Sequence, residues 1–344
     1  MKDARVTLKE IARRSHVSLG TVSAVINNKP WVKDETRQLV LRIIEELDYR
    51  PNVTARSLKV RRSWTLGVIA PDITNPFFPV IIRSIDLIAR DHGYHVILCD
   101  SNEDVELGIE NFELLLSRQV DGIILLGEIL PPRNLENYLK RYDLPIVAIE
   151  CDYGFSQVHT IITDNRHGGY LAARHLLSLG YRPLGMISDY LTLRAGRQRL
   201  YGSNERLLGF QAALKEFGAD FELRWVEEGE HSVEGGRNAM QHFFDRGDLP
   251  RAIVATNDLM AIGAIELIKE KGLNVPGDIA IVGYDNIPQA SFTSPKLTTI
   301  ALPKKKIGAK AVELLIPQLM GGQAEFQKVI MPIRILIRES CGAF

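Results

Sequence analysis

The stretch TLKEIARRSHVSLGTVSAVIN, residues 7–27, sets the interpretation of the first part of this 344-residue chain. Thr7 and Glu10 have the spacing of a capping box, and the apolar residues around them predict a short helix that ends near Arg14. After a tight connection, Ser18 can cap a second helix that runs through Ile26. Two short helices joined in this way are typical of a helix-turn-helix, whose second helix enters the major groove of DNA by its N-terminal end.

A third helix is expected from Lys33 or Asp34 to about Asp48, which completes a three-helix domain over residues 1–50. The second helix offers the exposed candidates for base contact, which are Ser18, Leu19, Gly20, Thr21, Ser23, Ala24 and Asn27. The alternative is a helical bundle that binds nothing, because helix pairs with short turns are common.

A hinge is predicted over residues 51–62. Proline lacks an amide donor and restricts the residue before it, so Arg50-Pro51 ends the third helix. Asn52 can then cap a fourth short helix over residues 53–60, which is basic and has one large apolar side chain, Leu58. Such a helix can enter a minor groove and unstack a base step; a charged linker is the alternative.

The zero net charge of the whole chain conceals an uneven distribution. Residues 1–62 hold 14 Lys and Arg against 7 Asp and Glu, and the remainder is acidic by the same margin. A small basic segment on an acidic body suggests a module that binds a polyanion, although a solvated charged surface gives the same count.

Composition narrows the class of protein. Hydrophobic residues make up 45% of the chain, which is enough to fill large cores and argues against general disorder. The three cysteines are too scattered for a disulfide framework or a metal site, and this usage fits a reducing cytoplasm. No 18-residue apolar run and no signal-peptide pattern is found, so we expect a cytoplasmic protein without a membrane segment.

From Ser63 onward, apolar strands alternate with helical patterns. The expected strands are Thr65–Ala70, His95–Asp100, Gly122–Leu126, Ile146–Glu150, Thr160–Thr163, Leu184–Ser188, Arg224–Glu228, Ala252–Thr256, Ile279–Tyr284 and Val329–Arg338. Buried strands between helices predict an α/β core of two doubly wound parallel-sheet subdomains. We place one subdomain at about 63–160 and 293–322, and the other at about 161–292 and 323–344.

Ligands of doubly wound sheets bind beyond the carboxyl ends of the strands. Carboxylates, amides and aromatic residues are frequent at those ends, among them Glu150, Asn257 and Asp285. Such groups suit a hydroxyl-rich ligand that forms hydrogen bonds and stacks on flat rings.

The first sixty residues resemble the headpiece of the LacI/GalR family of bacterial transcription regulators. The matching motifs are Thr7–Ala12, Val17-Ser18, Thr21–Ser23, Val25–Asn28, Glu35–Arg37, Tyr49–Asn52 and Ala55–Lys59. By position, the resemblance implies base reading by Leu19, Gly20 and Ala24, and other DNA contacts by Thr7, Ser18, Thr21, Ser23, Asn27 and Thr36. It implies minor-groove contacts by Asn52, Ala55, Leu58 and Lys59. Ala24 stands where many relatives have arginine, and it can offer only a methyl group, such as to thymine.

The remainder resembles the effector-binding core of the same family, which is similar to periplasmic sugar-binding proteins. The resemblance rests on motifs such as Asn75–Phe78, Arg206–Phe210, Thr256–Asp258 and Ile281–Asn286. It implies effector contacts by Phe77, Phe78, Glu150, Arg206, His231, Asn257 and Asp285. Arg206 can also be a brace of the cleft, Phe77 and Phe78 can be core residues, and Asp258 can be a helix cap.

Taken together, these patterns predict a repressor that reads a near-palindromic operator as a homodimer and responds to a sugar, sugar acid or sugar phosphate. The arginine-rich segment 194–206 favours an anionic effector, although a solvated loop explains it as well. No leucine heptads follow the last strand, so a dimer is expected rather than a tetramer. No catalytic or metal-binding motif and no cofactor site is found. The rivals are a solute-binding protein and a doubly wound sugar-processing enzyme.

Overall fold

The computed structural model describes residues 6–26, 28–49, 62–189, 201–322 and 325–343. The chain divides into two compact units, residues 1–63 and 64–344, which we call the headpiece and the core. No helix among the described residues is long and apolar enough to cross a bilayer.

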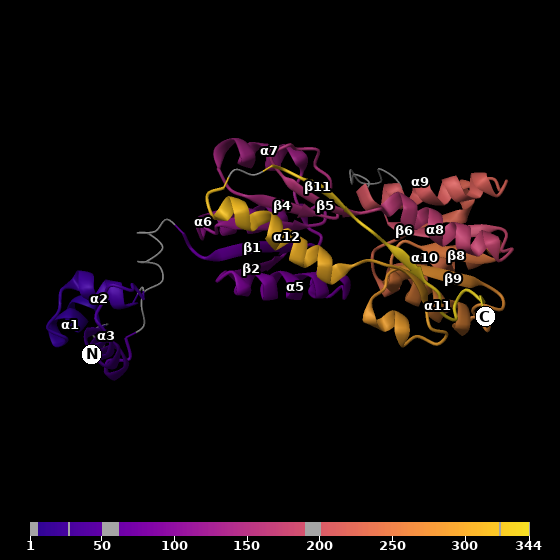
Figure 1. Cartoon of the computed structure of the whole chain (residues 1–344). Helices are drawn as coiled ribbons and strands as arrows, with labels where there is room; N and C mark the ends of the chain where they lie inside the picture. The colour runs from indigo at the N-terminus through magenta and orange to yellow at the C-terminus, as the bar shows by residue number, and fades with distance from the viewer. Residues whose placement is uncertain (1–5, 27, 50–61, 190–200, 323–324, 344) are drawn as a thin grey trace. The chain divides into compact units, whose positions relative to one another are not determined.

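The described residues of the headpiece form three helices, α1 (Leu8–Arg14), α2 (Leu19–Ile26) and α3 (Asp34–Glu46), close to the predicted ranges (Figure 1). Its apolar cluster is built from side chains of all three helices, including Ile11, Val22, Val25, Val40 and Ile43. These residues recur at helical spacing, so each helix buries one stripe against the other two.

Two predictions for the headpiece are wrong. Thr7 precedes α1 but its side chain makes no capping hydrogen bond, and the Glu10 carboxylate instead pairs with Arg13 and Arg14. Ala24, expected on the exposed face of α2, is only 5% exposed and packs in the headpiece cluster. The predicted hinge helix and Asn27 lie outside the described residues.

The described part of the core contains two six-stranded sheets. The first has the order β11-β5-β4-β3-β1-β2 and the second β12-β10-β9-β8-β6-β7. All adjacent strands are parallel except β10 and β12, which pair antiparallel. The doubly wound prediction is therefore confirmed, with one antiparallel edge strand added.

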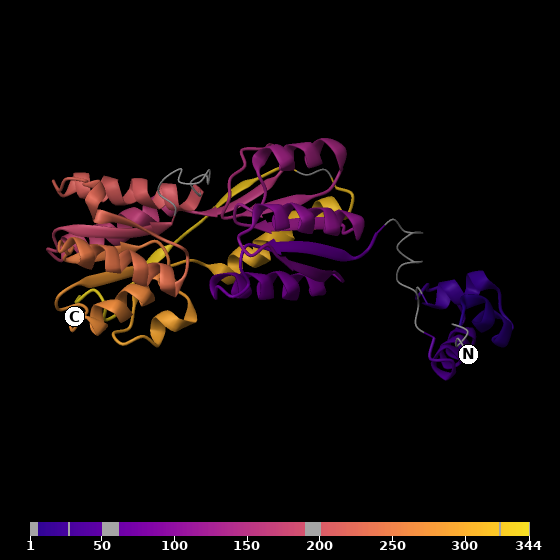
Figure 2. The ribbon, with the colours of Figure 1, turned by 180° about the vertical axis from the view of Figure 1, so that it is seen from behind.

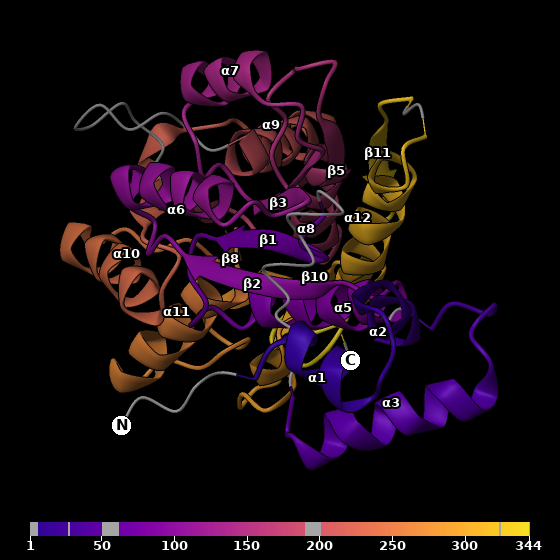
Figure 3. The same cartoon turned by 90° about the vertical axis from the view of Figure 1, so that its left-hand side faces the viewer.

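Helices cover both faces of each sheet (Figures 1 and 2). In the first subdomain the strands are β1 (Thr65–Ala70), β2 (His95–Asp100), β3 (Gly122–Leu126), β4 (Ile146–Ile149), β5 (His159–Thr163) and β11 (Lys328–Met331), with helices α5 (Phe77–Asp91), α6 (Val105–Ser117), α7 (Pro132–Arg141) and α12 (Lys304–Leu319). Figure 3 shows this sheet between α6 and α7 on one face and α5 and α12 on the other. Alternate residues of each strand point to opposite faces, so Ile123 and Ile124 enter different apolar clusters.

The second subdomain has strands β6 (Leu184–Asp189), β7 (Val226–Gly229), β8 (Ala252–Ala255), β9 (Ala280–Asp285), β10 (Thr298–Ala301) and β12 (Arg334–Leu336). Its helices are α8 (Asn165–Ser178), α9 (Tyr201–Glu216), α10 (Val233–Arg246) and α11 (Asp258–Glu270), with short 3-10 turns η2 (Leu223–Trp225) and η3 (Pro288–Ser291). Helices α8 and α9 pack together, as do α10 and α11.

The predicted division between subdomains needs correction in three places. Strand β5 pairs with β4, so the first subdomain extends through Thr163, beyond the predicted residue 160. Strand β10 pairs with β9 in the second sheet, whereas residues 293–322 were assigned to the first subdomain. The single strand expected over Val329–Arg338 is two strands, β11 and β12, one in each sheet, because Pro332 between them cannot continue a ladder.

Candidate functional site

The N-terminal end of α2 is the exposed part of the helix-turn-helix. Ser18 and Gly20 are exposed, and Leu19 remains 45% exposed although it is a large apolar residue. The Ser18 Oγ accepts a hydrogen bond from the Thr21 backbone N–H at 3.0 Å, so the predicted cap of α2 is confirmed. This end therefore presents small polar groups and one apolar side chain to its surroundings.

The other predicted DNA contacts have different positions. Thr7 is exposed, whereas Thr21, Ser23 and Thr36 are half-buried, and Ala24 is buried as described above. The remaining predicted contacts lie outside the described residues, namely Asn27, Asn52, Ala55, Leu58 and Lys59.

Sequence reasoning missed the residue that fixes the turn between α2 and α3. The Arg37 guanidinium donates to the Asn28 side-chain oxygen at 2.7 Å and to the Lys29 carbonyl at 2.5 Å. One cation thus satisfies two acceptors of the turn, which holds α2 against α3. Asn28 and Arg37 both belong to the matched motifs, but neither motif alone indicates that they pair.

In the core, polar side chains meet where the carboxyl ends of the two sheets face each other. We call this group the inter-subdomain cluster, which consists of Glu150, Asp189, Arg206, His231, Asn257, Asp258 and Asp285. The prediction named Glu150, Arg206, His231, Asn257 and Asp285, and these residues do come together, whereas it missed Asp189.

Arg206 lies at the centre of the inter-subdomain cluster. Its Nε donates to the Asn165 side-chain oxygen at 2.8 Å and its Nη1 to the Thr256 carbonyl at 2.5 Å. Its guanidinium carbon lies 3.8 Å from the centroid of the Tyr284 ring, a cation–π contact. A guanidinium has five N–H donors, so these two bonds leave donors available for a ligand.

Close packing of α8 on α9 sets the position of Arg206. A Cβ atom on Gly169 would lie 2.0 Å from the Arg206 carbonyl oxygen, and one on Gly209 would lie 1.9 Å from the Arg166 carbonyl oxygen. Only glycine permits the two helix backbones to approach this closely. The crossing therefore holds the first turns of α9, and with them Arg206, against α8.

Glu150 is tied to the segment that passes into the second subdomain. Its carboxylate accepts from the Thr163 N–H at 2.9 Å, the Thr163 hydroxyl at 3.0 Å and the Asn165 amide at 3.1 Å. Burial raises the pKa of Glu150, although Arg206 and these hydrogen bonds oppose the rise. Glu150 therefore acts as a brace around Arg206 in this structure.

Two further carboxyl groups are held almost without solvent. Burial raises the pKa of Asp285 to about 7, against the opposing charges of Arg206 and Lys304. Burial and the neighbouring Asp285 raise the pKa of Asp258 to about 8. Asp258 accepts from the Thr299 hydroxyl at 2.6 Å and the Ile287 N–H at 2.8 Å, so it is a core residue and not the cap of α11.

Asn257 is the residue that caps α11. Its side-chain oxygen accepts from the Met260 N–H at 2.7 Å, which fixes the orientation of the amide. Its Nδ2, the Ser188 hydroxyl, the Thr256 hydroxyl and the Asp189 Oδ1 are buried without a hydrogen-bond partner among the described residues. Four such groups at the ends of β6 and β8 indicate a place where a polar ligand binds, because unpaired buried polar atoms are costly.

His231 lies between two carboxylates. Its Nε2 is 3.0 Å from Asp189 Oδ2 and its Nδ1 is 3.2 Å from Glu103 Oε1. Burial lowers the pKa of His231, but the two carboxylates prevail and raise it to about 10, so the imidazole is a cation. For Asp189, burial raises the pKa, but His231, Ser203 and Arg206 outweigh this effect, so the pKa of Asp189 is lowered overall.

The two predicted aromatic contacts lie beside the inter-subdomain cluster. Phe77 is 6% exposed and packs edge-on against the half-buried Phe78, with ring centroids 5.1 Å apart. The Lys304 ammonium lies 5.9 Å from the Phe77 ring and donates to the Asp285 and Asn286 carbonyls. Phe77 is therefore a core residue, whereas Phe78 retains an accessible part of its ring.

Backbone conformation also marks this region. Several non-glycine residues at or shortly after strand ends have positive φ, including Glu150 at 55°, His231 at 42° and Asp285 at 103°. Such conformations are costly for L-residues and concentrate at functional sites.

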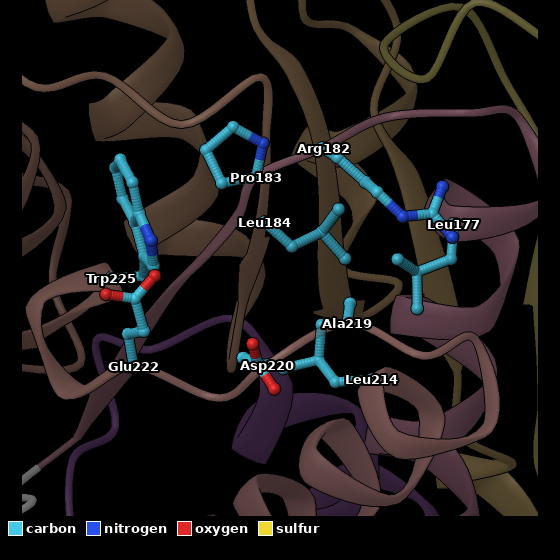
Figure 4. A pocket seen from close by; sticks show the side chains of 9 residues that line it. All are labelled: Leu177, Arg182, Pro183, Leu184, Leu214, Ala219, Asp220, Glu222 and Trp225. Atoms are coloured by element: carbon cyan, nitrogen blue, oxygen red, sulfur yellow. The ribbon is translucent and has the colours of Figure 1, made fainter.

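A separate pocket of about 310 Å³ lies in the second subdomain beside the start of β6 (Figure 4). Its buried side chains are apolar, with Leu184 and Trp225 among them, and its charged residues Arg182, Asp220 and Glu222 are exposed. The buried polar chemistry is therefore in the inter-subdomain cluster and not in this pocket.

Comparison with known proteins identifies both units. Residues 7–52 match the family described as bacterial regulatory proteins, lacI family, and residues 63–339 match periplasmic binding proteins and sugar binding domain of LacI family. The chain is 37% identical to the HTH-type transcriptional repressor PurR of Pasteurella multocida, over 97% of this chain and 98% of that protein. It is 33% identical to the ribose operon repressor of Haemophilus influenzae, over 97% of this chain and 98% of that protein.

A solved structure gives the same result for the fold. The Lac repressor dimer bound to operator and the anti-inducer ONPF aligns with a TM-score of 0.85 and 26% identity, over 98% of this chain and 99% of that chain. Because both family descriptions apply in order along almost the whole sequence, the chain belongs to the LacI family of bacterial regulatory proteins.

Proposed function

We propose that this chain is a cytoplasmic transcriptional repressor whose affinity for an operator is controlled by a small molecule bound at the inter-subdomain cluster. The exposed N-terminal end of α2, capped by Ser18 and carrying Leu19 and Gly20, is the observation that carries the DNA-binding part. The surplus of cations in residues 1–62 supplies phosphate contacts, which makes binding salt-dependent. Membership of the LacI family and similarity to two repressors support repression of transcription as the outcome of DNA binding.

The inter-subdomain cluster favours a neutral, hydroxyl-rich effector, such as a sugar. Asp189, Asp285 and Glu150 surround Arg206, so an anionic ligand would face several carboxyl groups. A polyol can donate to those acceptors and also accept from Arg206 and from Asn257 Nδ2. The described residues therefore favour a neutral sugar over the sugar acids and sugar phosphates that the arginine-rich segment suggested. Three arginines of that segment, Arg194, Arg197 and Arg199, lie outside the described residues.

A homodimer is the proposed assembly, with α5, β2 and α6 as its surface. Strand β2 is an edge of the first sheet, and Leu98 on it is 43% exposed. Leu87 on α5 and Leu114 on α6 are also exposed, by 54% and 44%. An apolar edge strand in a soluble assembly is usually covered, and a second copy related by a twofold axis would present two headpieces to a near-palindromic operator.

Selection of bound duplexes from a random DNA library tests the function directly. The full chain should enrich near-palindromic sequences, and adding the effector from a panel of sugars, sugar acids and nucleobases should change the yield of bound DNA. No preference among duplexes under any of these conditions would refute the proposal. Titration calorimetry with D-ribose, D-ribonate and ribose 5-phosphate tests the ligand class, and tighter binding of either anion would contradict the neutral assignment.

A further inference from the structure

The three places where the chain passes between subdomains lie at one edge of each sheet. The connections follow β5, β10 and β11. Strands β11 and β5 form one edge of the first sheet, and β12 and β10 form one edge of the second. Any relative rotation of the subdomains is therefore centred on that edge, because covalent connections restrict separation there. The opposite edges, formed by β2 and β7, are free of such connections and would separate most.

A charged contact joins the subdomains at those opposite edges. Glu103 follows β2, His231 follows β7, and Glu103 Oε1 lies 3.2 Å from His231 Nδ1. The second carboxylate on His231, Asp189 at the end of β6, belongs to the same subdomain as His231. We call Glu103, His231 and Asp189 the edge bridge, of which only the Glu103–His231 contact crosses between subdomains.

The backbone holds both ends of the edge bridge in position. Glu103 has a φ of 56° and His231 has a φ of 42°, values that L-residues rarely adopt. The Glu103 N–H donates to the Pro71 carbonyl at 2.6 Å, which anchors its loop to the end of β1. Asp189 is 1% exposed and accepts a hydrogen bond from the Ser203 hydroxyl. The His231 imidazolium is therefore paired with a carboxylate that is fixed in the interior of the second subdomain.

We infer that the edge bridge holds the two subdomains together before any effector binds, and thereby sets the arrangement from which the effector response starts. This inference deepens the proposed function, since it names the contact that regulates the inter-subdomain cluster. An effector must either separate Glu103 from His231 to enter or bind an arrangement in which that contact persists. Its influence on the equilibrium equals the difference in its affinity for the two arrangements.

The test measures the distance between subdomains in the full chain without DNA or effector. Spin labels on cysteines introduced at Glu110 of α6 and Asn238 of α10 would sit on the two elements that follow β2 and β7; both positions are exposed, whereas the native cysteines are buried. Pulsed electron paramagnetic resonance then gives the distribution of separations. E103Q should raise the population of long distances three- to tenfold relative to the short ones, or about 0.7–1.4 kcal/mol.

Two further variants make the outcome decisive. E103K, which places a cation opposite His231, should raise the long-distance population more than E103Q does. The exposed Glu106, in the first turn of α6, gives the matched control E106Q, which should match the parent. Distributions unchanged in both E103Q and E103K would overturn the inference. Because no DNA is present, this result is separate from the duplex selection, whose failure would remove the proposed function and leave the distance measurement valid.

Discussion

Asp285→Asn should remove a large part of the pH dependence of stability that this core has in mildly acidic solution. Asp285 is 6% exposed, and burial raises the pKa of its carboxyl group to about 7 in the folded chain. The ordinary value is 3.8, which applies to the unfolded chain. The folded state therefore binds more protons than the unfolded state between these two values, and the free energy of unfolding falls as the pH rises.

The size of the effect follows from the window chosen. Between pH 4.5 and 6.5 the carboxyl group is mostly protonated when folded and ionised when unfolded, so each pH unit costs about 1.4 kcal/mol. Asp285 alone then accounts for a fall of about 2.5 kcal/mol across the window. Asp258, whose pKa is raised to about 8 by burial and by Asp285, adds to the same slope.

Urea unfolding of the parent and of D285N at pH 4.5, 5.5 and 6.5 measures the prediction. The parent should lose stability steadily across the series, and D285N should lose about half as much, because its amide does not titrate whereas Asp258 still does. The exposed Asp220 provides the control D220N, which should keep the parent slope. A D285N slope equal to that of the parent would show that Asp285 is ionised in the folded chain.

The remaining predictions concern the ligand, the DNA and the packing. Arg206→Ala should weaken effector binding by more than 100-fold, since about 1.5–3 kcal/mol is at stake for each charge-assisted bond, while operator affinity measured by fluorescence anisotropy stays within twofold; an unchanged calorimetric affinity would make Arg206 a brace only. Leu58→Ala should weaken operator binding and leave effector affinity unchanged, and an unaltered operator affinity would rule out the wedge role. Gly209→Ala should lower the thermal unfolding midpoint by several degrees, because its Cβ would lie 1.9 Å from the Arg166 carbonyl oxygen; an unchanged midpoint would show that α8 and α9 separate at little cost.

The strands that sequence predicts best are those buried on both faces. Thr65–Ala70 and Gly122–Leu126 were predicted to the residue, because an unbroken apolar run with polar or glycine neighbours has few alternative readings. The edge strand His95–Asp100 has the predicted bounds as well, although it is partly exposed. The apolar run Val329–Arg338 predicts one strand wrongly, because its apolar residues continue through Pro332 into a second strand, which belongs to the other sheet. A proline inside the run was the available signal.

The site residues that the sequence predicts correctly are those whose position at the end of a single strand is enough to place them in the site. Asn257 lies two residues after β8 and Asp285 is the last residue of β9, and both reach the inter-subdomain cluster. The partners of His231 could not be predicted, because Glu103 and Asp189 are distant in sequence and only the facing of the two sheets brings them together. Ala24 was misplaced because the helical pattern of α2 does not show which small residues the other two helices cover.

The order of segments along the chain constrains when this protein can acquire regulation during its synthesis. Strand β11 and helix α12 complete the first subdomain, yet they emerge from the ribosome after every strand of the second subdomain except β12. The headpiece, which is a compact unit of its own, emerges first. A nascent polypeptide therefore has a DNA-binding headpiece well before its effector-binding core is complete. Translation that stalls short of residue 331 would leave a DNA-binding fragment that no effector regulates.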